Sequence, residues 1–262
     1  MTVKIYQVDA FTDQLFSGNP AAVCPLDHWL STYLMQNIAL ENNLAETAFF
    51  VRNGDRYDIR WFTPSVEVDL CGHATLASAF VLFHVWHVAG QQVTFFSERS
   101  GELIVTKDDD LLTLDFPTDE LTKVEISQQL TEGLNETPVE AYKGKTDYLL
   151  VFDSEEQIRN LKPDFAKIAT LRARGVIVTA RGKEVDFVSR FFAPQSGINE
   201  DPVTGSAHTT LTPYWFGRTG KTKMDAMQLS ERGGRLTCTY EKDRTLISGN
   251  ARLYLTGEIQ LA

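Results

Sequence analysis

The residue best suited to acid/base chemistry is Glu46, which lies in the largely apolar run LAETAFF at 44–50. A carboxyl group in apolar surroundings has a raised pKa and can exchange a proton near neutral pH. Most glutamates are instead solvated or paired with a cation. Glu46 is therefore a candidate catalytic residue, and an ordinary structural carboxylate is the alternative.

Two glycines, Gly72 in CGHAT at 71–75 and Gly205 in VTGSAH at 203–208, open segments that we expect to be helical. The unpaired amides of a helix start attract anions, and glycine lets a ligand approach the backbone closely. If both starts face one cleft, an acidic protein gains a carboxylate site without a basic patch. Capped, tightly packed helix starts are the alternative.

The polar residues near these glycines carry less information on their own. His73 follows Gly72, although a lone histidine is more often a hydrogen-bonded structural residue than a catalyst. Asp201 precedes a proline and is also explained as a turn-former. Ser206 is a candidate helix cap, and no G-x-S-x-G motif marks it as a nucleophile.

Cys71 also lies at a predicted helix start, where a thiolate is favoured and can act as an acid or base. Neither Cys24 nor Cys238 has a comparable position, so a two-thiol mechanism lacks a second partner. No spacing of His, Cys and carboxylates is typical of a metal site, and no phosphate-binding or dinucleotide glycine motif is present. We therefore expect chemistry without a metal or cofactor.

The chain repeats itself at about half its length. RWFTP at 60–64 recurs as RFFAP at 190–194, an offset of 130, and SERSG at 97–101 recurs as SERGG at 230–234, an offset of 133. A repeat of this length predicts two related domains. We expect residues 1–117 to form the first and 118–262 the second, with the last strand possibly crossing back to the first.

The elements that would position these residues follow from periodicity and turn residues. A helix is predicted from Asp27 to Asn43, a nearly all-apolar buried helix over 74–89, and a shorter helix over 204–216 that Pro213 should bend or end. Strands are predicted at 4–11, 21–24, 46–51, 57–62, 93–96, 103–106 and 111–116. Each domain is then a mostly antiparallel sheet wrapped around one helix, an α+β arrangement.

Charge and composition exclude several classes of partner. The net charge is −10 and the 25 Lys and Arg residues are scattered, which argues against nucleic acid. The most apolar stretch is too short to span a bilayer, and the first residues lack the features of a secretory signal. We expect a cytoplasmic protein with reduced thiols.

Several motifs together resemble the phenazine-biosynthesis PhzF-like proteins, which are structural relatives of diaminopimelate epimerase. They are VDAF at 8–11, FSGNPAAV at 16–23, LAETAF at 44–49, FTP at 62–64, EVDLCGHAT at 67–75 and EDPVTGSA at 200–207. The resemblance implies two barrel-like domains, each around a central helix, with the active site between them and a homodimeric assembly. It further implies that Glu46 shuttles the proton and that His73, Asp201 and Ser206 support it. The substrate-binding residues would be Asn19, Gly72, Thr204 and Gly205.

The reaction that the resemblance implies is a cofactor-independent isomerisation of trans-2,3-dihydro-3-hydroxyanthranilate or a similar small anionic metabolite. Epimerase relatives use two thiols instead, and Cys71 matches the first, whereas Asp201 and Pro202 stand where the second is expected. The expected function is thus isomerisation by glutamate acid/base catalysis. The alternatives are an epimerase or racemase that uses Cys71, and a non-catalytic metabolite-binding protein.

Overall fold

The computed structural model describes residues 1–261 and divides the chain into two compact units. The first unit consists of Met1–Asp115 with Ser248–Ala262, and the second of Phe116–Ile247. The division falls two residues before the boundary expected from the sequence, and the C-terminal strand belongs to the first unit. The crossing of the last strand, which the sequence left open, is therefore present.

The first unit is built on a sheet whose strands follow the order β17-β1-β2-β3-β4-β6-β7-β8, with β5 beside one end of β4. The pairs β2–β3 and β4–β6 are parallel, and the other pairs are antiparallel. The strands are β1 (Thr2–Ala10), β2 (Asn19–Leu26), β3 (Glu46–Asn53), β4 (Arg56–Phe62), β5 (Glu67–Val68), β6 (Gln92–Ser97), β7 (Gly101–Asp108), β8 (Leu111–Pro117) and β17 (Ala251–Gln260).

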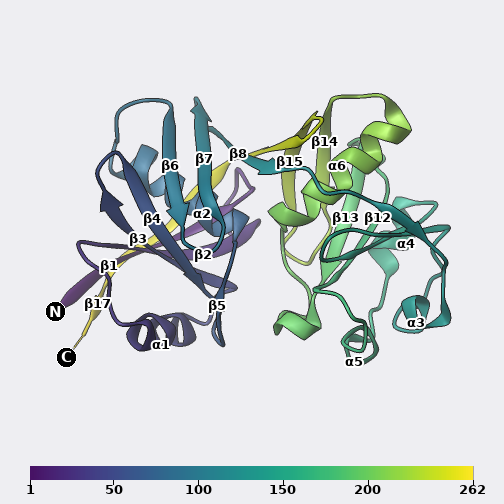
Figure 1. Ribbon diagram of the computed structural model, residues 1–262, viewed down its shortest axis with the longest axis horizontal. Helices are drawn as coiled ribbons and strands as arrows, with labels where there is room; N and C mark the ends of the chain where they lie inside the picture. Colours follow the sequence, from purple (N-terminus) through teal and green to yellow (C-terminus); the bar gives the residue numbers. More distant parts are fainter. Residues whose placement is uncertain (262) are drawn as a thin grey trace. The chain divides into compact units, whose positions relative to one another are not determined.

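Two helices of this unit pack against the sheet (Figure 1). The helix α1 (Thr32–Asn42) is capped by Ser31 and buries Met35 and Ile38 in a core shared with β2 and β3. The helix α2 (Gly72–Phe80) contacts β1, β2 and β3 and is buried at every position except its last. It continues as a π-helical turn, η1 (Val81–Val85). The nearly all-apolar segment is thus a central helix, as its sequence predicts.

The second unit contains a sheet with the order β9-β10-β11-β12-β13-β14-β15. Its strands are β9 (Thr122–Val124), β10 (Glu140–Lys143), β11 (Tyr148–Val151), β12 (Val176–Arg181), β13 (Phe187–Phe192), β14 (Lys223–Gln228), β15 (Gly234–Glu241) and β16 (Arg244–Gly249). Its helical segments are α3 (Gln128–Thr131), α4 (Glu155–Asn160), α5 (Phe165–Ile168), the 3-10 turn η2 (Pro194–Ser196) and α6 (Gly205–Thr219).

The helix α6 does not end at Pro213, which was one of the two outcomes expected from the sequence, but continues to Thr219. Proline has no backbone N–H and cannot bond the carbonyl group four residues earlier. That carbonyl, of Thr209, accepts a hydrogen bond from the backbone N–H of Asp119 at 3.2 Å. A partner from a distant segment thus satisfies the group that the proline leaves open.

The two units repeat the same pattern of strand pairing. The series β1-β2-β3-β4-β6-β7 alternates antiparallel and parallel pairs in the same order as β10-β11-β12-β13-β14-β15. Along the chain of each unit, the long buried helix, α2 or α6, comes after the fourth strand of the series and before the fifth. The sequence repeat thus corresponds to a repeated topology.

The repeat extends to individual side-chain contacts. Arg60 donates two hydrogen bonds to Glu67 in the first unit, and Arg190 donates two to Glu200 in the second. Each guanidinium group also lies over the aromatic ring two residues later in the chain. Because these contacts recur at the offsets seen in the sequence, they favour a fused duplication.

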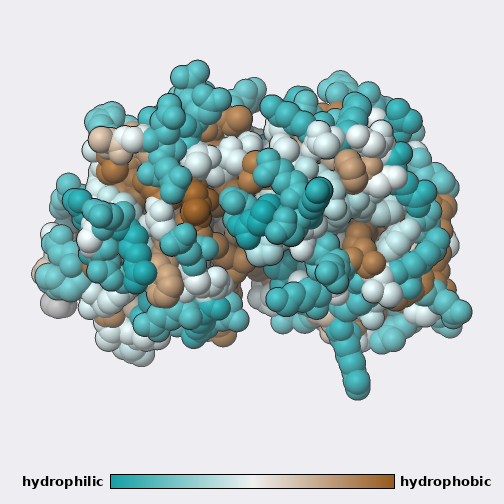
Figure 2. All heavy atoms as spheres, turned by 45° about the horizontal axis from the view of Figure 1, so that its top comes forward, coloured by the Kyte–Doolittle hydropathy of each residue, from teal (hydrophilic) through white to brown (hydrophobic). Residues whose placement is uncertain are grey.

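Hydrophilic residues cover most of the face seen in Figure 2, with hydrophobic residues between them. Among residues 1–261, no helix has the length and apolar character needed to cross a membrane.

Candidate functional site

The first unit gathers four of the residues singled out in the sequence. Asn19 is the first residue of β2 and Glu46 the first of β3, and these strands are parallel neighbours with Ala21 opposite Glu46. Gly72 and His73 open α2. Two parallel strands that start at the same edge of a sheet bring their first side chains together, and the start of α2 meets them there.

His73 lies at the centre of this group and is 4% exposed. Its Nε2 is 3.2 Å from Oε2 of Glu46, and its Nδ1 is 3.1 Å from Nδ2 of Asn19. The Sγ atom of Cys71 lies 3.5 Å from the same Nδ1. The acid/base candidate and its neighbouring histidine are therefore in direct contact, although 27 residues separate them in the chain.

The contacts of His73 define its protonation state. Burial lowers the pKa of His73 to about 3, so the ring is neutral near pH 7. The amide nitrogen of Asn19 can only donate, so Nδ1 accepts and the ring proton lies on Nε2. Nε2–H then faces Oε2 of Glu46 at 3.2 Å, a contact whose geometry falls short of a hydrogen bond but whose N–H dipole favours the ionised carboxylate.

The start of α2 completes this group. Its N-cap residue, Cys71, has no capping side-chain hydrogen bond, and the first helical backbone bond runs from Thr75 N–H to the Cys71 carbonyl. No side chain among the described residues therefore caps the helix, and its first amides remain oriented for an anion. The expectation that Gly72 lies at such a start is confirmed.

Folding also creates a set of possible metal ligands that sequence spacing did not reveal. One ligand atom each from Glu46, Cys71 and His73 lie within 4.8 Å of one another. The three residues were missed as a set because Glu46 comes from a strand and lies 25 residues before Cys71 in the chain. The expectation that the chain has no metal site rested on local spacing alone.

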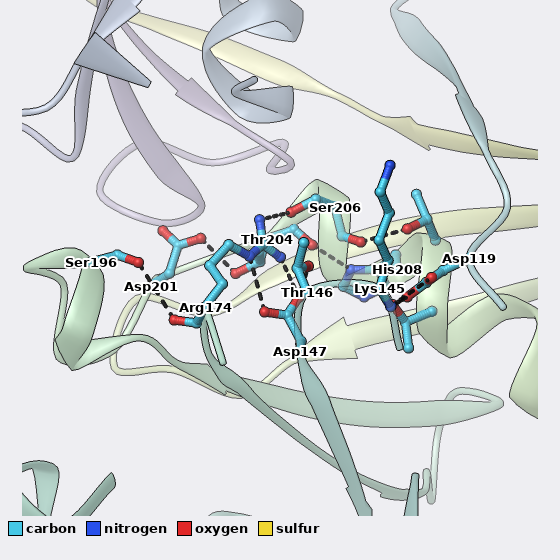
Figure 3. Close-up of polar contacts among 12 residues, drawn as sticks. Asp119, Lys145, Thr146, Asp147, Arg174, Ser196, Asp201, Thr204, Ser206 and His208 are labelled. Atoms are coloured by element: carbon cyan, nitrogen blue, oxygen red, sulfur yellow. Dashed lines mark hydrogen bonds and ion pairs between the residues drawn. The ribbon is translucent and has the colours of Figure 1, made fainter. Parts of the chain in front are cut away.

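The second unit brings together the other predicted residues, around the start of α6 (Figure 3). The Thr204 hydroxyl donates to Oδ2 of Asp201 at 2.5 Å. Gln228 accepts from the Thr204 backbone N–H at 2.9 Å and donates to the Asp201 carbonyl at 2.7 Å. These buried bonds hold the turn before Gly205, so Asp201 has a structural role here as well as the predicted catalytic one.

Ser206 contacts a cation that sequence reasoning missed. Arg174 Nη1 donates to the Ser206 hydroxyl at 2.9 Å, and its Nε and Nη2 donate to the carboxylate of Asp147 (Figure 3). Burial alone lowers the pKa of Arg174, but the bonds to Asp147 outweigh this effect and the pKa lies above its usual value. The helix start therefore has a guanidinium group, paired with Asp147, beside the Ser206 hydroxyl.

No local signal marks Arg174 or Asp147 in the sequence. Arg174 precedes Ser206 by 32 residues and follows Asp147 by 27, and neither lies in a recurring motif. Only the fold brings them to the helix start. The expected cleft shared by both helix starts stays a prediction.

Comparison with known proteins agrees with these observations. Residues 8–257 match the family described as phenazine biosynthesis-like protein. An uncharacterized isomerase of Pseudomonas aeruginosa is 54% identical over 263 residues and covers 100% of both chains. A crystal structure of a phenazine biosynthesis protein of the PhzF family from Enterococcus faecalis is 49% identical, with a TM-score of 0.97 and 100% of both chains covered.

The fold is shared more widely than the sequence. A hydroxyproline epimerase from Agrobacterium vitis matches 98% of this chain and 92% of its own with a TM-score of 0.62, at only 10% identity. This likeness concerns the fold alone, and it confirms the expected epimerase-like α+β class. From the match over residues 8–257 and the identity to full-length relatives, the chain belongs to the phenazine biosynthesis-like PhzC-PhzF family.

Proposed function

We propose that the chain is a cofactor-independent isomerase that moves a proton between two carbon atoms of a small carboxylated metabolite. The observation that carries the proposal is the buried contact between Glu46 and the neutral His73, beside the uncapped start of α2. The names of relatives support the same class of reaction, because one of them is an uncharacterized isomerase at 54% identity.

In this mechanism Glu46 acts first as the base and then as the acid. Oε2 faces Nε2 of His73 at 3.2 Å, so we assign the other oxygen, Oε1, to the substrate. A substrate C–H bond breaks and its proton forms an O–H bond on Glu46, and the electron pair delocalises toward the carboxylated part of the substrate. The carboxyl proton of Glu46 exchanges with solvent during its lifetime on the enzyme, and Glu46 then delivers a proton that forms a C–H bond at the second carbon and is ionised again.

Both helix starts supply elements that suit an anionic substrate. The first amides of α2, beginning at Gly72, lie in the same unit as Glu46 and suit a carboxylate or the negative charge that develops during proton transfer. In the second unit, Gly205 and Ser206 at the start of α6 have the charge of Arg174 beside them. We assign Asn19 and Thr204 to positioning, because each bonds a predicted catalytic residue.

We extend the proposal to location and assembly. Among residues 1–261 none of the three cysteines forms a disulfide, and this suits a reducing cytoplasmic compartment. The family resemblance favours a homodimer, and light scattering coupled to size-exclusion chromatography tests it, with a mass of twice 29.5 kDa as the expected result.

The test is deuterium incorporation. Candidate carboxylated metabolites, beginning with trans-2,3-dihydro-3-hydroxyanthranilate, are incubated with the protein in deuterated water and followed by NMR. We expect uptake at a substrate carbon, reduced by roughly 10²–10⁴-fold in Glu46→Gln because the proton acceptor is lost. Glu155→Gln is the matched control, since Glu155 is 7% exposed and Glu46 8%, and it should retain the rate.

Near wild-type uptake in Glu46→Gln would refute this mechanism. If Cys71→Ser loses uptake while Glu46→Gln keeps it, the epimerase alternative gains support. That alternative needs a second thiol, and Cys24 and Cys238 are fully buried with their pKa values raised by burial. Tight binding without uptake would instead indicate a metabolite-binding protein.

A further inference from the structure

We propose that Glu46, Cys71 and His73 form a binding site for a thiophilic divalent cation such as Zn²⁺, and that the bound ion blocks proton transfer. The binding step stands independently of the proposed function, whereas the inhibition rests on it. The ion is an inhibitor in this proposal and takes no part in the isomerisation.

The separation between the Glu46 and His73 donor atoms is close to that of a tetrahedral site, and Cys71 is the third ligand within reach. With Zn–S near 2.3 Å and Zn–N or Zn–O near 2.0–2.2 Å, a tetrahedral ion spaces its ligand atoms by roughly 3.4–3.6 Å. Here His73 Nε2 lies 3.2 Å from Glu46 Oε2 and 4.0 Å from Cys71 Sγ. The Glu46 oxygen needs to move by only a few tenths of an ångström, whereas Sγ also lies 3.5 Å from Nδ1, so the Cys71 side chain must rotate toward Nε2 to complete the coordination.

The chemical set of donors selects the type of cation. A thiolate, an imidazole and a carboxylate together favour zinc and similar borderline ions over Mg²⁺ and Ca²⁺, which prefer oxygen ligands. Three protein ligands leave a fourth position for water, as in sites that are not purely structural. All three residues are buried at 4–8% exposure, so the ion would be largely shielded from competing solvent.

The surroundings of His73 supply the outer support that metal-bound histidines usually have. Asn19 lies 3.1 Å from Nδ1, on the side of the ring away from Glu46. When Nε2 binds the ion, the ring proton moves to Nδ1, and a half-turn of the Asn19 amide presents its oxygen to that proton. The thiol proton of Cys71 leaves to solvent as the Zn–S bond forms.

Binding of the ion and proton transfer exclude each other. Glu46 cannot accept a substrate proton while its carboxylate is a metal ligand, and the Nε2–H that faces it is replaced by the ion. One equivalent of zinc should therefore abolish activity, and a chelator should restore it.

The binding test uses the metal-freed full chain and needs no substrate. Zinc is titrated in competition with a chromophoric chelator, and Co²⁺ reports on ligation through its thiolate charge-transfer absorption. We expect one ion per chain, binding weakened roughly 10²-fold in Cys71→Ser and the thiolate absorption lost. Cys24→Ala is the matched control, because Cys24 is a buried free thiol outside the cluster, and it should bind like the wild type.

Unchanged zinc affinity in Cys71→Ser would overturn the proposal, as would binding no tighter than that of Mg²⁺. The proposed function is judged separately, by Glu46-dependent deuterium uptake in the presence of a chelator. A protein that binds zinc through Cys71 but never exchanges a proton would retain the metal site and lose the isomerase assignment. Uptake that persists at full zinc occupancy would overturn the inhibitory role.

Discussion

At the scale of single residues, the tautomer of His73 depends on one amide group. Asn19 Nδ2 donates to Nδ1 and so keeps the ring proton on Nε2, where it faces Oε2 of Glu46 at 3.2 Å. A carboxylate at position 19 would instead accept a hydrogen bond from Nδ1–H. The ring proton would then lie on Nδ1, and the lone pair of Nε2 would face Glu46. The identity of residue 19 thus controls the state of the acid/base group.

We therefore predict that Asn19→Asp impairs turnover more than Asn19→Ala does. The alanine variant loses a positioning bond, and we expect about a tenfold decrease in kcat. The aspartate variant selects the wrong tautomer, and we expect a decrease on the order of 10³-fold, since a reversed histidine tautomer in serine proteases costs about 10⁴-fold. Steady-state kinetics on the identified substrate decide this, and equal losses in the two variants would contradict the tautomer argument.

A second prediction at this scale concerns Arg174. Its partner Asp147 has a side chain only 2% exposed, whereas that of Arg174 is 35% exposed. Arg174→Gln should lower the free energy of unfolding by about 2–3 kcal/mol, less than the 3–5 kcal/mol expected for a fully buried pair. Urea denaturation measures it. Arg235→Gln, which breaks the exposed pair with Glu184, is the control and should change stability by under about 0.5 kcal/mol.

The sequence indicated only part of this site. Glu46 and His73 were found because each has a local signal, apolar neighbours in one case and a glycine at a helix start in the other. Arg174 and Asp147 have no such signal, because their positions depend on pairing between distant strands. The grouping of Cys71 with Glu46 was missed for the same reason.

At the scale of elements, the two central helices have the same internal bond at their first turn. Thr75 Oγ1 donates to the Cys71 carbonyl at 2.6 Å, and His208 Nδ1 lies 2.8 Å from the Thr204 carbonyl and donates to it. The second copy thus uses a histidine where the first uses a threonine. Burial lowers the pKa of His208 to about 4, although its bond to Thr204 acts in the opposite direction.

This difference predicts an acid-sensitive helix. Between about pH 6.5 and pH 4 the unfolded chain binds a proton at residue 208 that the native state does not, so stability falls as the pH falls through this range. His208→Thr should lower the free energy of unfolding by about 1–2 kcal/mol at neutral pH, because packing is lost. The same variant should lose on the order of 2–3 kcal/mol less than the wild type does when the pH falls from about 6.5 to 4. Thermal unfolding at several pH values checks this. An acid dependence identical to that of the wild type would contradict it.

The course of α6 past Pro213 shows what local propensity cannot predict. The expectation that Pro213 bends or ends the helix has a physical basis, because the Thr209 carbonyl loses its helical hydrogen-bond donor. The N–H that replaces this partner belongs to Asp119, ninety residues earlier, whose carboxylate also accepts from Thr210. A prediction from the sequence around the proline cannot include that contact.

At the scale of the whole molecule, the duplication was the most predictable property. The recurring motifs at offsets of 130 and 133 correspond to matching strand orders and to the paired Arg60–Glu67 and Arg190–Glu200 contacts. The division of the chain was harder to predict, because the sequence of the last strand does not specify its partner. That partner is β1, which β17 pairs along Thr2–Ala10.

The pairing of β17 with β1 leads to the last prediction. Side chains of β17 such as Leu253 and Tyr254 are exposed, whereas Ile259 packs against the core, so the strand contributes its backbone bonds to β1 and part of that core. A chain that stops at Asn250 should leave the edge of β1 open, and amides of residues 1–115 should exchange faster while those of 116–247 keep their protection. Hydrogen exchange with mass spectrometry resolves the two regions. Leu253→Ser is the matched control, since it changes an exposed side chain and retains the strand. Unaltered protection of residues 1–115 in the truncated chain would show that β17 is not required for the first unit.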